Sequence, residues 1–121
     1  MSNNYTAQDP EAYLDQVVGN GQCVAYVQTS ANAPHTSLWQ QGTRVKGETS
    51  LERGTAIATF DPNGRYGNHT DGRSHAAIYL SQNEHGLMVI DQWVGQPVHQ
   101  RLIRFGGATP VNDGNKFYVI V

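Results

Sequence analysis

One stretch decides the fold: residues 75–93 read HAAIYLSQNEHGLMVIDQW. Two runs of mainly aliphatic and aromatic residues, 75–80 and 87–93, lie on either side of the polar residues 81–86. This pattern predicts two β-strands joined by a hairpin-like turn. Strands joined in this way pair antiparallel, so the sheet is expected to be antiparallel.

Three further strands are expected outside the hairpin, at residues 54–60, at about 98–105 and at 116–121. Helical patterns occur only before residue 43. Helices first and antiparallel strands after them predict one α+β domain over residues 1–121. In this prediction, N-terminal helices pack on an antiparallel sheet of about five strands, connected as a meander.

Two N-terminal helices are expected. Asp9 and Pro10 favour the start of the first helix, and Gly19 ends its apolar stripe. The second helix begins within residues 19–23 and runs to about Asn32, with apolar residues at helical spacing along one face.

Composition excludes several classes of protein. The chain has 121 residues, and 8 Lys and Arg against 10 Asp and Glu give a formal charge of -2 with no basic stripe, so no nucleic-acid partner is expected. The longest apolar runs, such as residues 87–90, are too short for membrane insertion. The lone Cys23 excludes an intrachain disulfide. Residues 1–5 show no secretory signal, so we expect synthesis in the cytoplasm.

Cys23 is the most informative residue. It follows the polar, flexible residues 20–22 and opens the second predicted helix. Free N–H groups and the helix dipole lower a thiol pKa at such a position, and the same N–H groups can hold an oxyanion. The alternative is that Cys23 is a small buried apolar residue.

His75 and Asp91 would supply the base and its orienting acid. His75 opens a strand, and the small Ala76 and Ala77 leave its imidazole accessible. Asp91 interrupts the apolar end of the next strand, where a carboxylate needs a partner. A hairpin brings His75 close to Asp91 or Trp93, which predicts a Cys-His-Asp triad. A histidine at a strand end can equally be a surface residue.

Three short motifs carry a resemblance to a known superfamily: GQCVAYV at residues 21–27, SHAAIY at 74–79 and VIDQW at 89–93. Their order and spacing resemble those of the papain-like NlpC and CHAP peptidoglycan amidases. Residues 37–39 and 54–60, with the small size of the chain, look like the type VI secretion amidase effectors. The resemblance spans about residues 19–105.

The resemblance implies a cysteine peptidase or amidase that cuts bacterial peptidoglycan stem peptides or cross-links without a cofactor. It implies Cys23 as nucleophile, His75 as general base and Asp91, or another polar residue, as third member. It also implies an antibacterial effector that acts in the periplasm of a target bacterium after secretion. A cognate immunity protein that blocks the cleft is an implied partner.

Supporting residues are less specific. Gln22 precedes Cys23 and is a candidate for shaping the oxyanion site, although a polar residue at a helix start needs no such role. Trp93 is a candidate wall of a substrate groove, whereas Trp39 is expected in the core. The polar, glycine-rich residues 61–74 make a long loop, which is typical of a functional or mobile segment.

Two other functions are considered. A metal-dependent hydrolase would use His69, Asp71, His75 and Asp91, but no metal-binding signature accompanies them, so no metal is expected. A non-catalytic cell-wall or ligand-binding module would use the long loop and exposed aromatic residues. Cys23 buried with no imidazole near it would favour the binding module.

Overall fold

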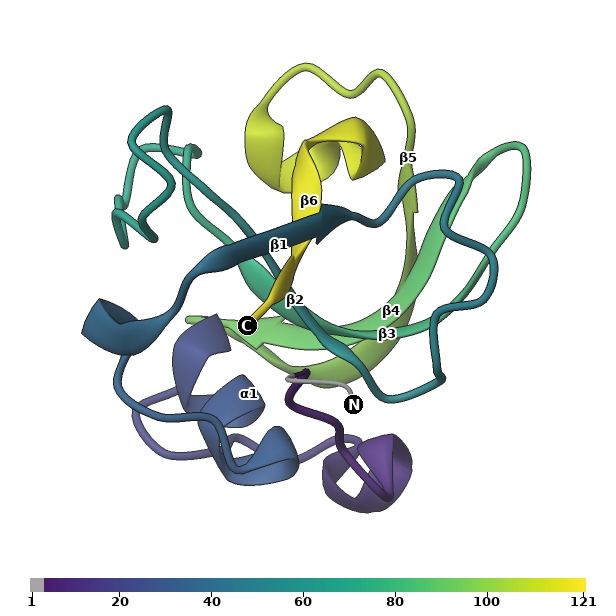
Figure 1. Cartoon of the computed structure of the whole chain (residues 1–121). Helices are drawn as coiled ribbons and strands as arrows, with labels where there is room; N and C mark the ends of the chain where they lie inside the picture. The colour runs from purple at the N-terminus through teal and green to yellow at the C-terminus, as the bar shows by residue number, and fades with distance from the viewer. Residues whose placement is uncertain (1–3) are drawn as a thin grey trace.

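A six-stranded antiparallel sheet forms the body of the computed structural model, which describes residues 4–121 (Figure 1). The strands are β1 (Gln41–Arg44), β2 (Ala56–Thr59), β3 (Ala76–Gln82), β4 (Gly86–Trp93), β5 (Gln96–Arg104) and β6 (Phe117–Ile120). Their spatial order is β1-β6-β2-β3-β4-β5, and all neighbours pair antiparallel. The predicted hairpin is β3 and β4, with Ile78 opposite Ile90.

The sheet differs from the predicted meander in two ways. The sixth strand, β1, was not expected, because its side chains are mostly exposed and residues 41–44 show no apolar alternation. The last strand, β6, does not follow β5 in space. It lies between β1 and β2, with Val119 opposite Ile57, so only β2 to β5 form a meander.

One α-helix, α1 (Cys23–Ala31), crosses one face of the sheet (Figure 1). It begins within the predicted residues and is followed by the C-cap residue Asn32, whose φ of 54° is left-handed. Its contacts are mainly with β3 and β4, the two strands of the hairpin. The expected packing of an N-terminal helix on an antiparallel sheet is therefore confirmed for this helix.

The prediction of a first α-helix after Asp9 is wrong. In its place the structure has the 3₁₀ helix η1 (Pro10–Tyr13), followed by a turn at residues 14–16 in which Asp15 has a left-handed φ of 69°. The Asp15 N–H donates to the Val98 carbonyl at 2.8 Å, and the Val98 N–H donates to the Gln16 carbonyl at 2.9 Å. Because these bonds cover the outer side of β5, the segment uses its backbone groups on the sheet edge rather than within a helix.

Three short 3₁₀ helices complete the regular structure: η2 (Thr36–Leu38), η3 (Pro110–Asn112) and η4 (Gly114–Lys116). Among residues 4–121, no helix combines the length and the apolar character that a bilayer crossing requires. Residues 1–3, the start of the segment in which no secretory signal was expected, lie outside the described residues.

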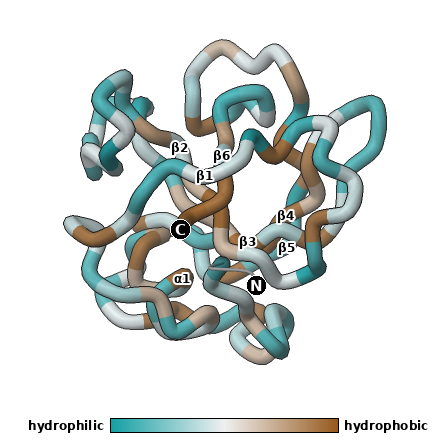
Figure 2. Tube along the Cα trace, in the orientation of Figure 1, coloured by the Kyte–Doolittle hydropathy of each residue, from teal (hydrophilic) through white to brown (hydrophobic). Residues whose placement is uncertain are grey.

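Both faces of the sheet are buried at its central strands, β2 to β4. On one face, Ile78 and Ile90 pack with α1 and the fully buried Trp39, which confirms Trp39 as a core residue. On the other face, Ile57 and Val89 belong to a second apolar cluster. Burial on both faces explains why the central strands are continuous apolar runs, visible as brown segments in Figure 2.

Candidate active site

Cys23 lies at the N-terminus of α1, as expected. Gln22 is the N-cap residue, and its side chain makes no capping hydrogen bond, so the first-turn N–H groups of α1 have no side-chain acceptor there. Gly19 and Gly21 precede it with φ of 57° and 86°, a backbone region that favours glycine. The Cys23 side chain is partly exposed and lines a cleft.

His75 and Asp91 form a buried pair next to Cys23. His75 lies directly before β3 and is 5% exposed, and Asp91 on β4 is fully buried. His75 Nε2 lies 2.7 Å from Asp91 Oδ2. The register of the hairpin, in which Ile78 is opposite Ile90, places both side chains on the same face of the sheet. The structure thus pairs His75 with Asp91, while Trp93 packs its ring edge-on to His75 at 6.2 Å between centroids.

Two residues of β5 also converge on Asp91. Arg101 Nε donates to Asp91 Oδ2 at 2.9 Å, and His99 Nε2 lies 3.1 Å from Oδ1 without the alignment of a hydrogen bond. Burial raises the pKa of Asp91, but the hydrogen bonds and charges of His75 and Arg101 outweigh it and lower the pKa below its usual value. Sequence reasoning missed both β5 residues, although they alternate along a strand whose apolar pattern is mixed with polar residues.

The electrostatics of Cys23 and His75 are coupled. Burial lowers the pKa of His75, but hydrogen bonds with Asp91 and Cys23, and their charges, raise it to about 9. Burial raises the pKa of Cys23, but the hydrogen bond and charge of His75 and the Ala76 N–H outweigh it, so the thiol pKa lies below its ordinary value. Because Asp91 occupies Nε2, Nδ1 is the ring nitrogen left for Cys23. This arrangement favours a thiolate beside an imidazolium.

Tyr66, from the long loop 61–74, contacts the sulfur of Cys23. Its hydroxyl lies 3.8 Å from Sγ, and its ring packs against Trp39 at 4.9 Å between centroids. Burial and the charge of Cys23 raise the Tyr66 pKa, so the hydroxyl stays protonated and can donate to the sulfur. Sequence reasoning missed Tyr66, whose only signal is a single aromatic residue in a polar loop.

One cleft of about 450 Å³ is lined by Cys23, Tyr66, His75 and Arg101. Its wall includes both substrate-site candidates, Gln22 and Trp93. Trp93 is 41% exposed, and the Arg101 guanidinium lies 5.0 Å from its ring centroid. The long loop forms the other rim of the cleft through residues 66–74.

The four residues considered for a metal do not form one cluster. His69 pairs with Asp61 at 2.9 Å, and Asp71 pairs with Arg73 at 2.9 Å, while His75 and Asp91 bind each other. Within the described part of the chain, no group of three or more His, Cys, Asp or Glu is arranged to hold a metal ion.

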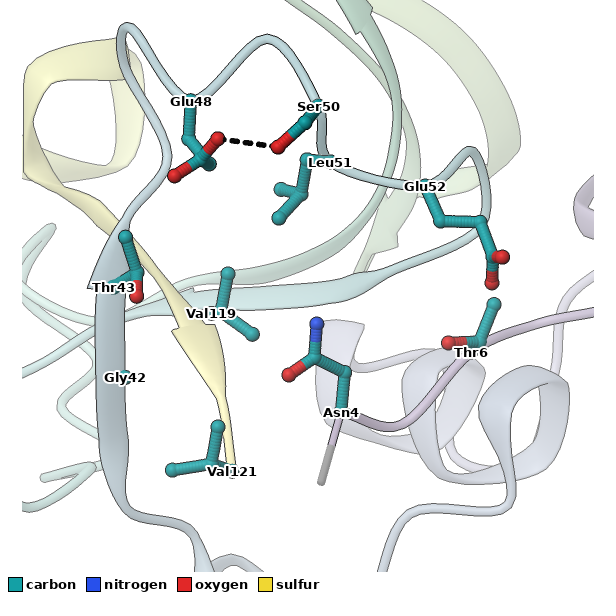
Figure 3. Close-up of a pocket in the computed structure, with 10 residues that line it drawn as sticks. All are labelled: Asn4, Thr6, Gly42, Thr43, Glu48, Ser50, Leu51, Glu52, Val119 and Val121. Atoms are coloured by element: carbon teal, nitrogen blue, oxygen red, sulfur yellow. Dashed lines mark hydrogen bonds between the residues drawn. The ribbon is translucent and has the colours of Figure 1, made fainter. Parts of the chain in front are cut away.

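A second cleft lies away from these groups (Figure 3). It has a volume of about 380 Å³ and lies between the N-terminal segment, β1 and the loop that carries Glu48, Ser50 and Glu52. Ser50 donates to Glu48 at 2.6 Å within it. None of the residues expected to carry chemistry lines this cleft, so the first cleft is the candidate active site.

Comparison with known proteins identifies the family of the chain. The sequence model of the family described as domesticated amidase effector 2 matches residues 1–120. The chain belongs to this family. A type VI secretion amidase effector 2 protein of Salmonella typhi is 43% identical over 106 residues, which cover 83% of this chain and 78% of that protein. Domesticated amidase effector 2 of Ixodes scapularis is 37% identical over 109 residues, covering 85% and 72%.

A solved structure supports the same family at the level of the fold. The structure of type 6 secretion amidase effector 2 (Tae2) superposes with a TM-score of 0.83 at 36% identity, over 96% of this chain and 93% of that chain. The papain-like α+β fold and the likeness to small type VI secretion amidase effectors, both expected from the sequence, are confirmed for this amidase effector.

Proposed function

We propose that this amidase effector is a cysteine amidase that hydrolyses amide bonds in bacterial peptidoglycan, in stem peptides or cross-links. The observation that carries the proposal is the buried His75–Asp91 pair, 2.7 Å apart, in the same cleft as a thiol of lowered pKa at a helix start. A non-catalytic binding module has no need of these three features together. Cys23 is only partly buried and interacts with an imidazole, which argues against that alternative.

In the proposed reaction, Cys23 Sγ attacks the carbonyl carbon of the amide as a thiolate. The N–H groups of the first turn of α1 hold the oxyanion that forms, and Gln22 is a candidate to complete this site. The imidazolium of His75 gives its proton to the leaving amine, and the C–N bond breaks to leave a thioester. His75 then takes a proton from water as the water attacks the thioester, and the C–S bond breaks to release a carboxylic acid, which ionises in solvent, and the Cys23 thiolate beside the imidazolium.

Asp91 and Trp93 have supporting roles in this proposal. Asp91 holds His75 through Nε2 and stabilises its charged form, with Arg101 holding the carboxylate in turn. Trp93, half-exposed at the rim, forms a wall of the cleft against which the substrate packs.

The relatives named as type VI secretion effectors support an antibacterial role. We propose that the protein acts in the periplasm of a target bacterium after secretion. A cognate immunity protein that covers the cleft would protect the producing cell.

Digestion of purified peptidoglycan tests the proposal. Wild-type protein and Cys23→Ala are incubated with it, and the products are identified by mass. New stem-peptide fragments from the wild type alone would support the cysteine mechanism and identify the bond that is cut. Fragments from a folded Cys23→Ala variant would overturn the nucleophile, and their loss on adding a chelator would point to a metal hydrolase. No fragments from folded wild type would favour a binding module.

A further inference from the structure

Gln92 is a fully buried polar residue that the mechanism does not use. It follows Asp91 on β4 and is 0% exposed. Its Oε1 accepts from the Val18 N–H at 3.0 Å, and its Nε2 donates to the Val18 carbonyl at 2.9 Å and the Gln22 carbonyl at 2.8 Å. The whole amide is therefore bound to the backbone of the segment that leads into α1.

Consecutive residues of β4 face opposite sides of the sheet, because side chains alternate along a strand. Asp91 lies on the side of Val89, whereas Gln92 lies on the side of Ile90, which packs in the α1 cluster. One residue of β4 therefore binds His75, and the next binds the backbone beside Cys23.

The segment before α1 has few other anchors. Residues 19–22 form turns, and Gln22 gives α1 no side-chain cap. A capping side chain would occupy the first-turn N–H groups that the proposed reaction uses for the oxyanion. The Gln22 carbonyl accepts from the Ala25 N–H at 3.1 Å, so Gln92 binds the carbonyl on which α1 begins, while the Gln22 side chain leaves the first turn uncapped.

We propose that Gln92 is a positioning residue that fixes the start of α1 and thereby the place of the Cys23 sulfur relative to His75. The proposal rests on the proposed function, in which Cys23 is the nucleophile. In this proposal, two consecutive side chains of β4 hold the two reacting groups. Asp91 holds the base, His75, and Gln92 holds the backbone that carries the nucleophile, Cys23.

The test compares Gln92→Met, which keeps the length but removes all three hydrogen bonds, with Gln82→Met. Gln82 is a matched control, because its amide likewise binds backbone groups, at Val45, Gly47 and Glu48, but far from the cleft. Cys23 is the only cysteine, so alkylation by iodoacetamide across pH reports on that thiol alone. Peptidoglycan turnover and thermal unfolding are measured on the same samples.

Both variants are expected to lower the melting temperature. Only Gln92→Met is expected to shift the alkylation profile of Cys23 upward, toward the ordinary thiol pKa of about 8.5. It should also lower kcat by about 10- to 100-fold with KM changed less than about threefold, because a small displacement of a reacting atom is costly to the rate.

An alkylation profile and kcat like those of the wild type, in folded Gln92→Met, would overturn the proposal and leave Gln92 a structural residue. If Gln92→Met does not fold, the shorter amide of Gln92→Asn is tested by the same criteria, and loss of the fold there too would overturn it. Turnover by Cys23→Ala would overturn the proposed function instead, since the alkylation profile does not depend on turnover.

Discussion

Replacing Asp91 by Asn removes one charge and leaves the shape of the side chain nearly unchanged. The hydrogen bond with Asp91 is the largest of the effects that raise the pKa of His75 to about 9, against burial, which lowers it. At about pH 7.5, a pKa of about 9 leaves about 97% of the imidazole protonated, whereas the ordinary value of 6.5 leaves about 9%. The hydrogen bond and charge of Cys23 still raise the His75 pKa against burial once the Asp91 charge is gone, so a full return of the pKa to 6.5, with about a tenfold loss of imidazolium, is the upper limit of the effect.

The expected result follows from the sign of this shift. A raised histidine pKa keeps the imidazolium present up to about pH 9, and activity falls as pH rises through that value. In Asp91→Asn, the alkaline limb moves to lower pH, and activity at about pH 7.5 falls by up to about tenfold. His75→Ala removes the proton donor altogether, so its loss of activity is expected to be greater.

The measurement is the pH profile of peptidoglycan turnover, together with alkylation of Cys23, for wild type and Asp91→Asn. Asp61→Asn is the matched control, because Asp61 also binds a histidine, His69, at 2.9 Å. It should leave the alkaline limb in place. An alkaline limb that Asp91→Asn does not move, in protein shown to be folded, would refute the assignment of Asp91 as the partner of the base.

Two further predictions concern the two tryptophans and a glycine of the long loop. Trp39→Ala should lower the free energy of unfolding by about 3–5 kcal/mol, because Trp39 is fully buried, whereas Trp93→Ala should mainly lower kcat/KM. Chemical denaturation measures the stability of both variants, and peptidoglycan turnover measures their activity. Equal losses of stability in the two variants would contradict the placement of Trp39 in the core and Trp93 at the cleft. Gly67→Ala should cost about 1–3 kcal/mol, because its Cβ would clash with the side chains of His69 and Asp61, and an unchanged melting temperature would count against the position of the loop.

Local patterns in the sequence were sufficient for the elements that carry the proposed triad. Polar residues before an apolar helical stripe placed the start of α1 at Cys23, and the apolar runs around residues 81–86 placed β3 and β4. A hairpin then brings the far ends of its strands together, so the proximity of His75 to Asp91 or Trp93 followed from the chain order, and the structure shows both beside it.

Local patterns were misleading where a segment forms backbone hydrogen bonds with a strand that is distant in sequence. The apolar stripe after Pro10 has the spacing of a helix, but Asp15 and Gln16 bind the backbone of Val98 instead. Propensity differs by less than about 1 kcal/mol per residue between most side chains, so backbone bonds to the edge of a sheet can override it.

The sequence by itself determined the class of the fold, the helix that begins at Cys23 and the hairpin that carries His75 and Asp91. Only the tertiary structure decided that β6 lies between β1 and β2, and that Tyr66, Arg101 and Gln92 converge on the site. The periodicity of apolar residues in the sequence indicates only which residues share a face within one helix or strand. Contacts between residues 18 and 92, or 23 and 66, depend on strand register and on the path of a long loop, which the packing of the whole chain fixes.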